Sequence, residues 1–436
     1  FWIERQQLAQ SRRDTELAER AKELARREAE KTLGRLVVSY LANGSNALNQ
    51  GDVAGAALWF AQAAREDHGT NRTLHQARIA PLLARCPKLL AVLAHRGPIH
   101  AVAFSAAGRT VATAGDDHTV QLWNPATGEP LGPPLRHAAA VQCVAFSPDD
   151  RRLAAGCADG TVQVWNPATG EPVAGPLSQG GTVQRLAFHP TGQWLLSVGQ
   201  GAPPKVWNAN SGQVRRTLTQ EGAVLDATFS PDGQCLATAG ADHAARLWKF
   251  DGPAEAVFRL PHDAPVTQAA FSPDSRRLVT VSGRAARLWN VVTGEPAEWR
   301  MEHEVPVTSV AFSPDGLTVA TVGQDRVVRL WDTRTGQPRR SPIELDAVAR
   351  RLAFSPDGRY LLVTDDQHGQ VWDTINGQPA TPPFHHGDGA KDARFSPAGD
   401  RVVSAAGDGS AYVTEWWSGI PLAAAHLAAP TSEPTA

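Results

Sequence analysis

Residues 310–332 read VAFSPDGLTVATVGQDRVVRLWD, and this stretch decides the fold. Larger apolar residues occupy every second position in three short runs within it, as Val310 and Phe312 do in the first run. A period of two predicts short β-strands. After the first run, Ser-Pro-Asp-Gly at 313–316 places proline where φ is close to its ring-fixed value and glycine where φ is positive, which is typical of a hairpin turn. The stretch therefore predicts three short strands joined by turns.

The same phrase recurs eight times, at intervals of 41 or 42 residues. Its eight phenylalanines are Phe104, Phe146, Phe188, Phe229, Phe271, Phe312, Phe354 and Phe395. A tryptophan follows the first seven of them after 18 or 19 residues, at Trp123, Trp165, Trp207, Trp248, Trp289, Trp331 and Trp372. A fixed period of this length indicates stacked supersecondary units, and it directs the question of function from catalysis toward surface recognition.

This pattern resembles the WD40 repeat family, in which an apolar strand ends in Phe-Ser-Pro-Asp-Gly and a later strand ends in Trp-Asp. The resemblance covers roughly residues 88–425. It implies a mainly β fold, an eight-bladed β-propeller preceded by an α-helical segment, with seven blades and a stray unit as the rival count. Family rings are usually closed by a strand from the other end of the chain. Residues 89–93 and 420–425 are both candidates for that strand, and the choice stays open.

The resemblance also implies a buried hydrogen-bond chain of His, Ser or Thr, Asp and Trp in each blade. Two units contain the whole set, namely His95, Thr113, Asp117 and Trp123 in unit one, and His303, Thr321, Asp325 and Trp331 in unit six. The other units lack members; Ala155 replaces the hydroxyl residue in unit two, and Gln220 replaces the histidine in unit four. An active site is normally built once, whereas this set recurs with the fold period. We therefore expect a structural role, no catalytic residues and no enzyme.

In many WD40 rings the partner docks on the face lined by the residue four before each phenylalanine. Here those candidate residues are His100, Gln142, Gln184, Leu225, Thr267, Thr308, Arg350 and Lys391. The set is mostly neutral and becomes basic only at units seven and eight. We expect a protein or peptide ligand, ideally one with an acidic end, and the alternative is that these are ordinary solvated loop residues.

Composition and cysteine usage exclude several other classes. The chain is 42% hydrophobic and 20% charged, with a formal net charge of −2, so no bulk charge indicates nucleic acid or an anionic membrane. Its four cysteines show no CxxC spacing, so no zinc site, other metal site or cofactor is expected. Cys143 and Cys157 fall on neighbouring strands of unit two, where two free buried thiols are favoured over a disulfide.

The first 87 residues form a separate, helical region. Residues 1–35 carry alternating charges at i, i+4 spacing, which predicts a solvated helix: a connector is favoured over a coiled coil, and a nucleic-acid arm is the least favoured. Residues 36–87 resemble one tetratricopeptide repeat, through Gly44, Gly51-Asp52, Ala56, Phe60 and Ala63. Two helices are expected at about 36–49 and 53–66, with a capping helix at 73–85. A generic helical hairpin is the alternative.

The order of these parts suggests a second function. A charged helix, a helical hairpin and then WD40 units at 88–427, with a disordered tail at 428–436, resemble the C-terminal regions of bacterial receptor-like Ser/Thr protein kinases. The start Phe1-Trp2-Ile3-Glu4-Arg5 is typical of the interfacial end of a removed membrane helix. No kinase motif and no spanning segment occurs in the sequence.

The favoured function is thus a non-catalytic interaction scaffold or sensor. The alternative is a regulatory region of a membrane kinase whose kinase domain lies outside this chain, tethered through a missing N-terminal helix. The chain would be cytoplasmic in the first case and extracytoplasmic in the second.

Overall fold

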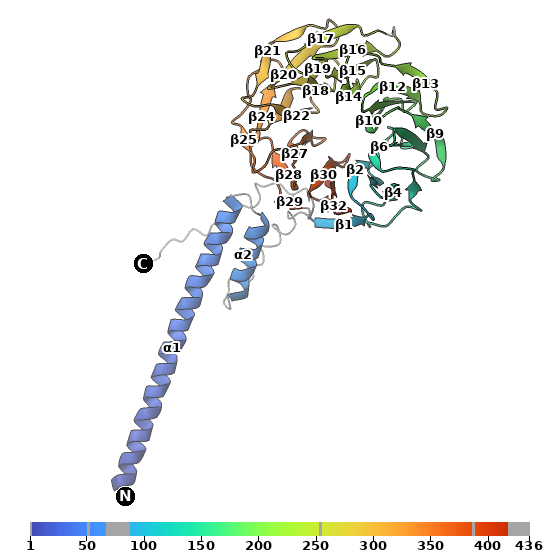
Figure 1. Cartoon of the computed structure of the whole chain (residues 1–436). Helices are drawn as coiled ribbons and strands as arrows, with labels where there is room; N and C mark the ends of the chain where they lie inside the picture. The colour runs from blue at the N-terminus through green and yellow to red at the C-terminus, as the bar shows by residue number, and fades with distance from the viewer. Residues whose placement is uncertain (1, 50–52, 67–87, 253–254, 386–388, 417–436) are drawn as a thin grey trace. The chain divides into compact units, whose positions relative to one another are not determined.

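The structure of the protein is a computed structural model that describes residues 2–49, 53–66, 88–252, 255–385 and 389–416. The chain divides into two compact units, Pro87–Trp417 and a smaller one made of Phe1–Cys86 with Ser418–Ala436. The larger unit is a ring of four-stranded antiparallel sheets, eight of them in the described residues, arranged radially around a centre (Figure 1). Eight blades are therefore confirmed, and the seven-blade alternative is wrong.

We number the blades in chain order. Blade one contains β2 (Ile99–Phe104), β3 (Val111–Gly115), β4 (Thr119–Trp123) and β5 (Leu135–Arg136). Blade two contains β6 (Val141–Phe146), β7 (Leu153–Cys157), β8 (Thr161–Trp165) and β9 (Pro172–Ser178). Blade three contains β10 (Val183–Phe188), β11 (Trp194–Gly199), β12 (Ala202–Asn208) and β13 (Val214–Thr217). Blade four contains β14 (Val224–Phe229), β15 (Cys235–Gly240), β16 (Ala244–Lys249) and β17 (Phe258–Pro261).

Blade five contains β18 (Val266–Phe271), β19 (Arg277–Ser282), β20 (Ala285–Asn290) and β21 (Pro296–Glu302). Blade six contains β22 (Val307–Phe312), β23 (Thr318–Gly323), β24 (Val327–Asp332) and β25 (Ile343–Glu344). Blade seven contains β26 (Arg351–Phe354), β27 (Tyr360–Thr364), β28 (His368–Asp373) and β29 (Phe384–His385). Blade eight contains β30 (Ala390–Phe395), β31 (Arg401–Ala406), β32 (Ser410–Glu415) and β1 (Lys88–Ala94).

The ring is closed by β1, the first strand of the chain in sequence. It pairs antiparallel with β32, so that Val92 lies opposite Tyr412 and Leu93 opposite Ala411. Leu93 is fully buried in a cluster shared with blade one. Of the two candidate closing segments, 89–93 is thus the one that completes blade eight. The other, 420–425, lies outside the described residues.

Apolar side chains fill the spaces between neighbouring blades. Among the described residues there are eight buried hydrophobic clusters, and each is shared by two adjacent blades. One cluster packs Val328 and Leu330 of blade six against Leu352 and Leu361 of blade seven. Because burying such a side chain contributes about 1.5–3 kcal/mol, the alternating strands are stable only when neighbouring blades cover them.

The turn between the first two strands of a blade is built by its own polar side chains. In blade six, the Ser313 hydroxyl donates to Asp315 Oδ1 at 2.5 Å and accepts from the Thr318 N–H at 2.9 Å. The Leu317 N–H donates to Asp315 at 2.9 Å, and Gly316 has φ of +68°. Only glycine adopts this conformation without strain, which explains the Ser-Pro-Asp-Gly phrase.

The two cysteines of blade two are not directly paired across the sheet. Cys157 lies opposite Val141 and Cys143 lies opposite Gly156, and both thiols are free. Burial raises the pKa of Cys143 to about 12 and that of Cys157 to about 11. Both side chains therefore stay protonated at neutral pH.

The smaller unit contains α1 (Trp2–Asn49) and α2 (Val53–Glu66). The prediction of separate helices at 1–35 and 36–49 is wrong, because α1 runs continuously through both. The two helices pack closely: a Cβ added at Gly44 would lie 2.6 Å from Phe60 Cε1, and Tyr40 stacks on Trp59 at 5.8 Å between ring centroids.

Buried Ala56, Phe60 and Ala63 line this contact, whereas Leu58 is 73% exposed. The capping helix expected at 73–85 lies outside the described residues. In the described part of the chain, no helix combines the length and apolar character needed to cross a membrane.

Candidate functional site

Blade one contains a buried chain of hydrogen bonds. His95 Nε2 lies 2.6 Å from Thr113 Oγ1, and His95 Nδ1 lies 3.0 Å from Asp117 Oδ2. The indole N–H of Trp123 donates to the same Thr113 oxygen at 2.7 Å, and the Thr119 hydroxyl donates to Asp117 at 2.7 Å. The His95 side chain is only 1% exposed. The structure thus brings together all four residues named for unit one and occupies both nitrogens of the histidine.

Blade six brings its four residues together through a fifth. His303 Nε2 lies 2.7 Å from Thr321 Oγ1, which also accepts from Trp331 at 2.7 Å. His303 Nδ1, however, lies 3.8 Å from Asp325, because the Arg329 guanidinium stands between them, 2.7 Å from the nitrogen and 2.6 Å from the carboxylate. Burial, and secondarily Arg329, lowers the pKa of His303 to about 4, so the ring is neutral at pH 7 and Nδ1 accepts from Arg329.

Glutamine replaces histidine in blades three and four, where Ser197 donates to Gln179 and Thr238 to Gln220. The sequence identified Gln220 as the substitute in blade four but missed Gln179 in blade three. Each of these side-chain pairs is separated by 18 residues, as His95 and Thr113 are. That constant spacing is the signal that could have identified Gln179.

Blade two shows the chain broken. Ala155 occupies the hydroxyl position, and the buried Trp165 Nε1 and His137 Nε2 have no hydrogen-bond partner among the described residues. Burial lowers the pKa of His137 to about 4, with the Asp159 carboxylate opposing this shift. The two rings pack edge to face, 5.5 Å between centroids. An unsatisfied buried polar atom costs about 1–3 kcal/mol. The fold therefore tolerates the loss of this network in at least one blade.

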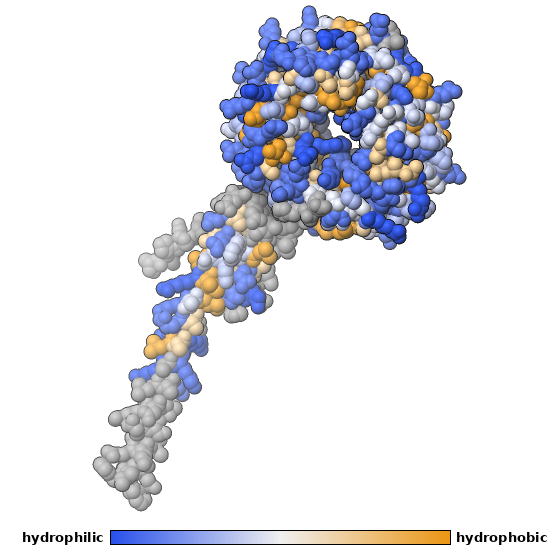
Figure 2. Space-filling view, viewed as in Figure 1, coloured by the Kyte–Doolittle hydropathy of each residue, from blue (hydrophilic) through white to orange (hydrophobic). Residues whose placement is uncertain are grey.

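The eight predicted partner-face residues all lie at the start of an innermost strand. Seven of them are the second residue of their strand, as His100 is in β2 and Lys391 is in β30, whereas Arg350 directly precedes β26. Gln184, Leu225, Thr267, Arg350 and Lys391 are exposed, and His100, Gln142 and Thr308 are half-buried. The face of the ring that is turned to the viewer in Figure 2 is mainly polar, with small separate apolar areas and a hollow centre.

Three of these residues are already engaged within the ring. His100 Nε2 lies 2.7 Å from Asp116, the Thr308 hydroxyl donates to the Ala349 carbonyl at 2.7 Å, and Arg350 donates to Asp366 at 2.9 Å. The hydrogen bond to Asp366 raises the pKa of Arg350 further above its ordinary value. The carboxylate of Asp366 thus offsets the positive charge that the sequence suggested at blade seven.

One residue further along the innermost strands, side chains join several blades to the next. Asp226 accepts from the Ala269 N–H at 3.1 Å, Gln268 from Val310 at 3.0 Å, and Ser309 from Leu352 at 3.3 Å. Asp392 likewise contacts the Val102 N–H at 3.5 Å, across the junction of blades eight and one. No sequence motif marked these residues, because their partners are backbone groups 42 or 43 residues away, or 290 residues away for Asp392.

Arginines neutralise two of these carboxylates. Arg185 lies 2.5 Å from Asp226, and Arg351 lies 3.0 Å from Asp392. Burial raises the pKa of Asp226, and the Arg185 charge opposes this effect. Part of the innermost wall is therefore a polar layer of paired charges and side-chain to backbone contacts. Within the residues that the structure describes, no cluster of His, Cys, Asp or Glu side chains could hold a metal ion.

Comparison with known proteins agrees with this architecture. The sequence model of the family described as "WD domain, G-beta repeat" matches residues 87–124, 129–166, 212–249, 255–290, 299–332 and 346–373. The ring is a WD40 propeller. The crystal structure of the computationally designed protein Ika8 is similar to it, with a TM-score of 0.65 and 26% sequence identity over 75% of this chain and 99% of that chain. No curated protein matches the chain.

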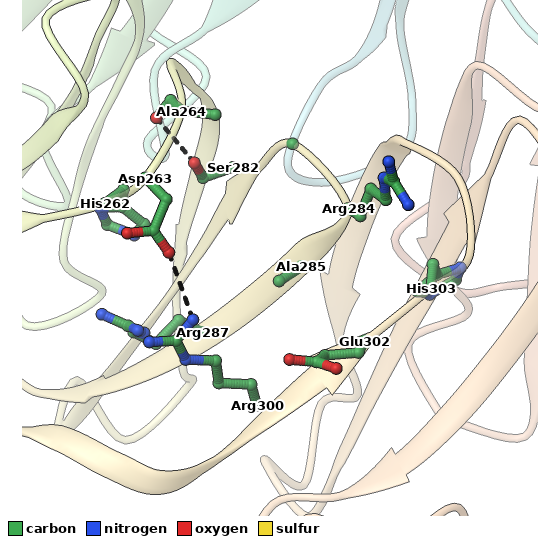
Figure 3. A pocket seen from close by; sticks show the side chains of 11 residues that line it. His262, Asp263, Ala264, Ser282, Arg284, Ala285, Arg287, Arg300, Glu302 and His303 are labelled. Carbon is green, nitrogen blue, oxygen red and sulfur yellow. Dashed lines mark hydrogen bonds and ion pairs between the residues drawn. The ribbon is translucent and has the colours of Figure 1, made fainter.

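The WD40 propeller also contains a cavity of about 380 Å³ in blade five (Figure 3). Its walls come from the loop before β18, the turn between β19 and β20, and the end of β21. Three arginines line it, Arg284, Arg287 and Arg300, together with the carboxylates Asp263 and Glu302. It opens at the same end of blade five as Thr267 of the predicted partner face, because that residue follows the first of these loops. No motif in the sequence marked these residues.

Proposed function

We propose that this chain is a non-catalytic protein-interaction scaffold or sensor whose WD40 propeller binds a protein or peptide. WD40 propellers are typical of interaction scaffolds. The observation that carries the proposal is the hydrogen bonding within the recurring His, Thr and Trp sets. Their polar atoms bond to one another inside the blades, and so they are not presented to a substrate.

The histidines of these sets are poorly suited to proton transfer. Burial lowers the pKa of His137, His262 and His303 to about 4. His262 also uses both nitrogens, at 2.9 Å to the Leu260 carbonyl and 2.7 Å to Thr280. A general base needs a free nitrogen within reach of the substrate, and a pKa near the working pH is best. In blades one, five and six the histidine instead bonds to the threonine hydroxyl that accepts from the buried tryptophan N–H.

The residues that differ between blades carry the proposed recognition. At the start of the innermost strands, the exposed side chains Gln184, Leu225, Thr267 and Lys391 project from one rigid ring without a shared chemical type. Exposed and varied residues on a rigid scaffold are the usual material of binding surfaces. The predicted partner face has two cations, Arg350 and Lys391. Arg350 is bound to Asp366, so Lys391 is the one available to a partner.

The test is affinity capture with the full chain, followed by cross-linking and mass spectrometry. The double variant Arg350→Glu with Lys391→Glu is expected to lose the captured partner. A matched control, Arg109→Glu with Arg276→Glu, changes the same charge at exposed positions in the first turns of blades one and five, at the other end of the ring. Equal capture by the test variant and the wild type would refute this binding face.

A second candidate function is the regulatory region of a membrane Ser/Thr kinase. It is supported by the order of a 48-residue helix, a helical hairpin and a propeller along the chain. The helix is charged and solvated, with Arg27 and Glu23 paired at 3.2 Å on exposed side chains. Sequencing the gene upstream of Phe1 tests it: a kinase domain followed by an apolar helix is expected, and their absence would contradict this candidate.

A further inference from the structure

Blade five differs from its neighbours in how one arginine is neutralised. Two residues before their tryptophans, blades four and six place Arg246 and Arg329. Arg246 lies 2.5 Å from Asp242, and Arg329 lies 2.6 Å from Asp325, so each blade supplies its own carboxylate. Blade five has Arg287 at the same position. Within the described ranges, Arg287 forms no ion pair; its contacts are the Pro261 carbonyl at 3.3 Å and the Trp289 ring at 5.3 Å.

The turn between β19 and β20 explains the missing carboxylate. In blade six the last paired residues before the turn are Val322 and Val328, which leaves five residues, including Asp325, in the turn. In blade five the equivalent pair is Val281 and Ala286, which leaves four residues, one fewer than in blade six. Ser282 and Ala285 also pair, so Gly283 and Arg284 alone form the tip of the hairpin. The shorter turn omits the position that carries aspartate. Gly283 accordingly has φ of +55°, which a two-residue hairpin requires.

The cavity described above lies where that turn is shortened, and Arg287 lines it (Figure 3). Arg300 also lines it and is bound to Asp263 at 3.3 Å, an aspartate whose side chain is 90% exposed. Glu302 contributes a second carboxylate and Arg284 a third cation. His262 and His303 are neutral at pH 7, so the lining has an excess of one positive charge. Among the described residues neither Arg284 nor Arg287 forms an ion pair with a carboxylate, but Arg284 is exposed whereas Arg287 is half-buried.

The surroundings of Arg287 are unfavourable for an unpaired cation. Partial burial, and then the nearby Arg300 charge, lowers its pKa from the ordinary value, and the Asp263 carboxylate only partly offsets this. A bound anion would relieve both effects. A guanidinium binds a carboxylate through paired, charge-assisted hydrogen bonds.

We propose that the cavity of blade five binds a carboxylate of a protein partner, which takes the place that Asp242 and Asp325 occupy in blades four and six. Arg287 is the main binding residue, and Arg300 and Arg284 border the site. The carboxylate belongs to an acidic side chain or to a C-terminus. The inference rests on the proposed function, because the carboxylate comes from an interaction partner.

The experiment is a titration of the full chain, observed through the side-chain Nε–H signals of arginine in NMR spectra at constant ionic strength. N-acetyl-aspartate methylamide represents an acidic side chain and N-acetylglycine represents a C-terminus. N-acetyl-asparagine methylamide is the neutral control. We expect a saturable shift of the Arg287 signal with a carboxylate probe and affinity at least about tenfold weaker for the neutral one. The tighter of the two acids identifies the source.

Two variants make the test specific. In Arg287→Gln, the signals of Arg284 and Arg300 are expected to stop responding to the acids, while circular dichroism shows an intact fold. In a second variant, the blade-six residues Gly-Gln-Asp-Arg replace Ser282-Gly283-Arg284, which restores an internal aspartate; we expect it to lose probe binding as well. An equal response to the acidic and neutral probes, or unchanged acid binding in Arg287→Gln, would overturn the proposal.

Failure of this inference is distinguishable from failure of the proposed function. If the acids do not bind but a partner is captured at the predicted face, the cavity proposal alone is wrong. If the acids bind at Arg287 but no partner depends on the propeller, the cavity stands and the scaffold proposal is wrong.

Discussion

Blades one and two are nearly the same structure with different interiors. Both pair the end of the first strand with the start of the second, Phe104 with Val111 and Phe146 with Leu153. Both follow the tryptophan with the identical sequence Asn-Pro-Ala-Thr-Gly-Glu-Pro, at 124–130 and 166–172. Yet Thr113 completes a hydrogen-bond chain in blade one, and Ala155 leaves two buried polar atoms without partners in blade two.

This difference shows that the pattern that forms the strands and the residues that form the buried hydrogen-bond chain act independently. Apolar alternation specifies the first three strands and their register, because these are the same in both blades. The polar chain adds stability to a backbone that forms without it. The following predictions test that separation.

The largest effect is expected when blade one is made to resemble blade two. Thr113→Val keeps the side-chain shape but removes the acceptor of the Trp123 N–H and the partner of His95 Nε2. We expect the free energy of unfolding to fall by about 3 kcal/mol, since two buried polar groups lose their partner. Urea denaturation measures it, with Thr127→Val in an exposed turn as control. A loss equal to that of the control would show that the network contributes nothing.

The second prediction concerns the pH dependence contributed by blade two. The pKa of His137 is about 4 in the folded state, below the ordinary value of 6.5. Between pH 6.5 and pH 4 this histidine is therefore protonated in the unfolded state but neutral in the folded state. Stability therefore falls as pH drops from 6.5 toward 4, by about 2 kcal/mol at pH 5.

His137→Gln removes this contribution. Its melting temperature should match that of the wild type at pH 7 and exceed it at pH 5. Thermal unfolding at the two pH values provides the check, and parallel pH profiles of the two proteins would contradict the assignment.

The third prediction repairs blade two. Ala155→Ser adds a hydroxyl at the position where Ser197 accepts from Trp207 at 2.7 Å in blade three, with the same ten-residue spacing from the tryptophan. We expect a gain of about 1 kcal/mol in the free energy of unfolding. Ala154→Ser, on the neighbouring buried position, should instead destabilise the protein because its hydroxyl enters an apolar cluster. The reverse order of the two variants would refute this account.

The smallest effect is expected at the surface. The pair of His100 and Asp116 has side chains that are 25% and 45% exposed. Asp116→Asn should change the free energy of unfolding by less than about 0.5 kcal/mol, because exposed pairs contribute little. Denaturation in urea would contradict this if the loss approached that of Thr113→Val.

The fold was predictable because its determinants are local and repeated. The repeated phenylalanine located all eight blades, with a tryptophan at a constant spacing in the first seven, and Ser-Pro-Asp-Gly located turns such as 313–316. The candidate site was harder to predict from the sequence, because it depends on contacts between side chains that are distant in the sequence. Arg329 interposes itself between His303 and Asp325, and nothing in the spacing of the motif indicates this. The cavity at Arg287 lies where the turn between β19 and β20 lacks the position that carries aspartate in blade six.

Closure of the ring by β1 has a consequence for how the protein folds. The partners Lys88 and Glu415 are about 330 residues apart, so β1 leaves the ribosome long before its neighbour exists. Bringing such distant segments together costs roughly 5 kcal/mol of chain entropy, and topologies rich in distant contacts fold slowly. Although β1 is synthesised before the other strands of the ring, it can pair with β32 only after all of them have been made. Until then, the nascent ring has two open sheet edges that can pair with another molecule.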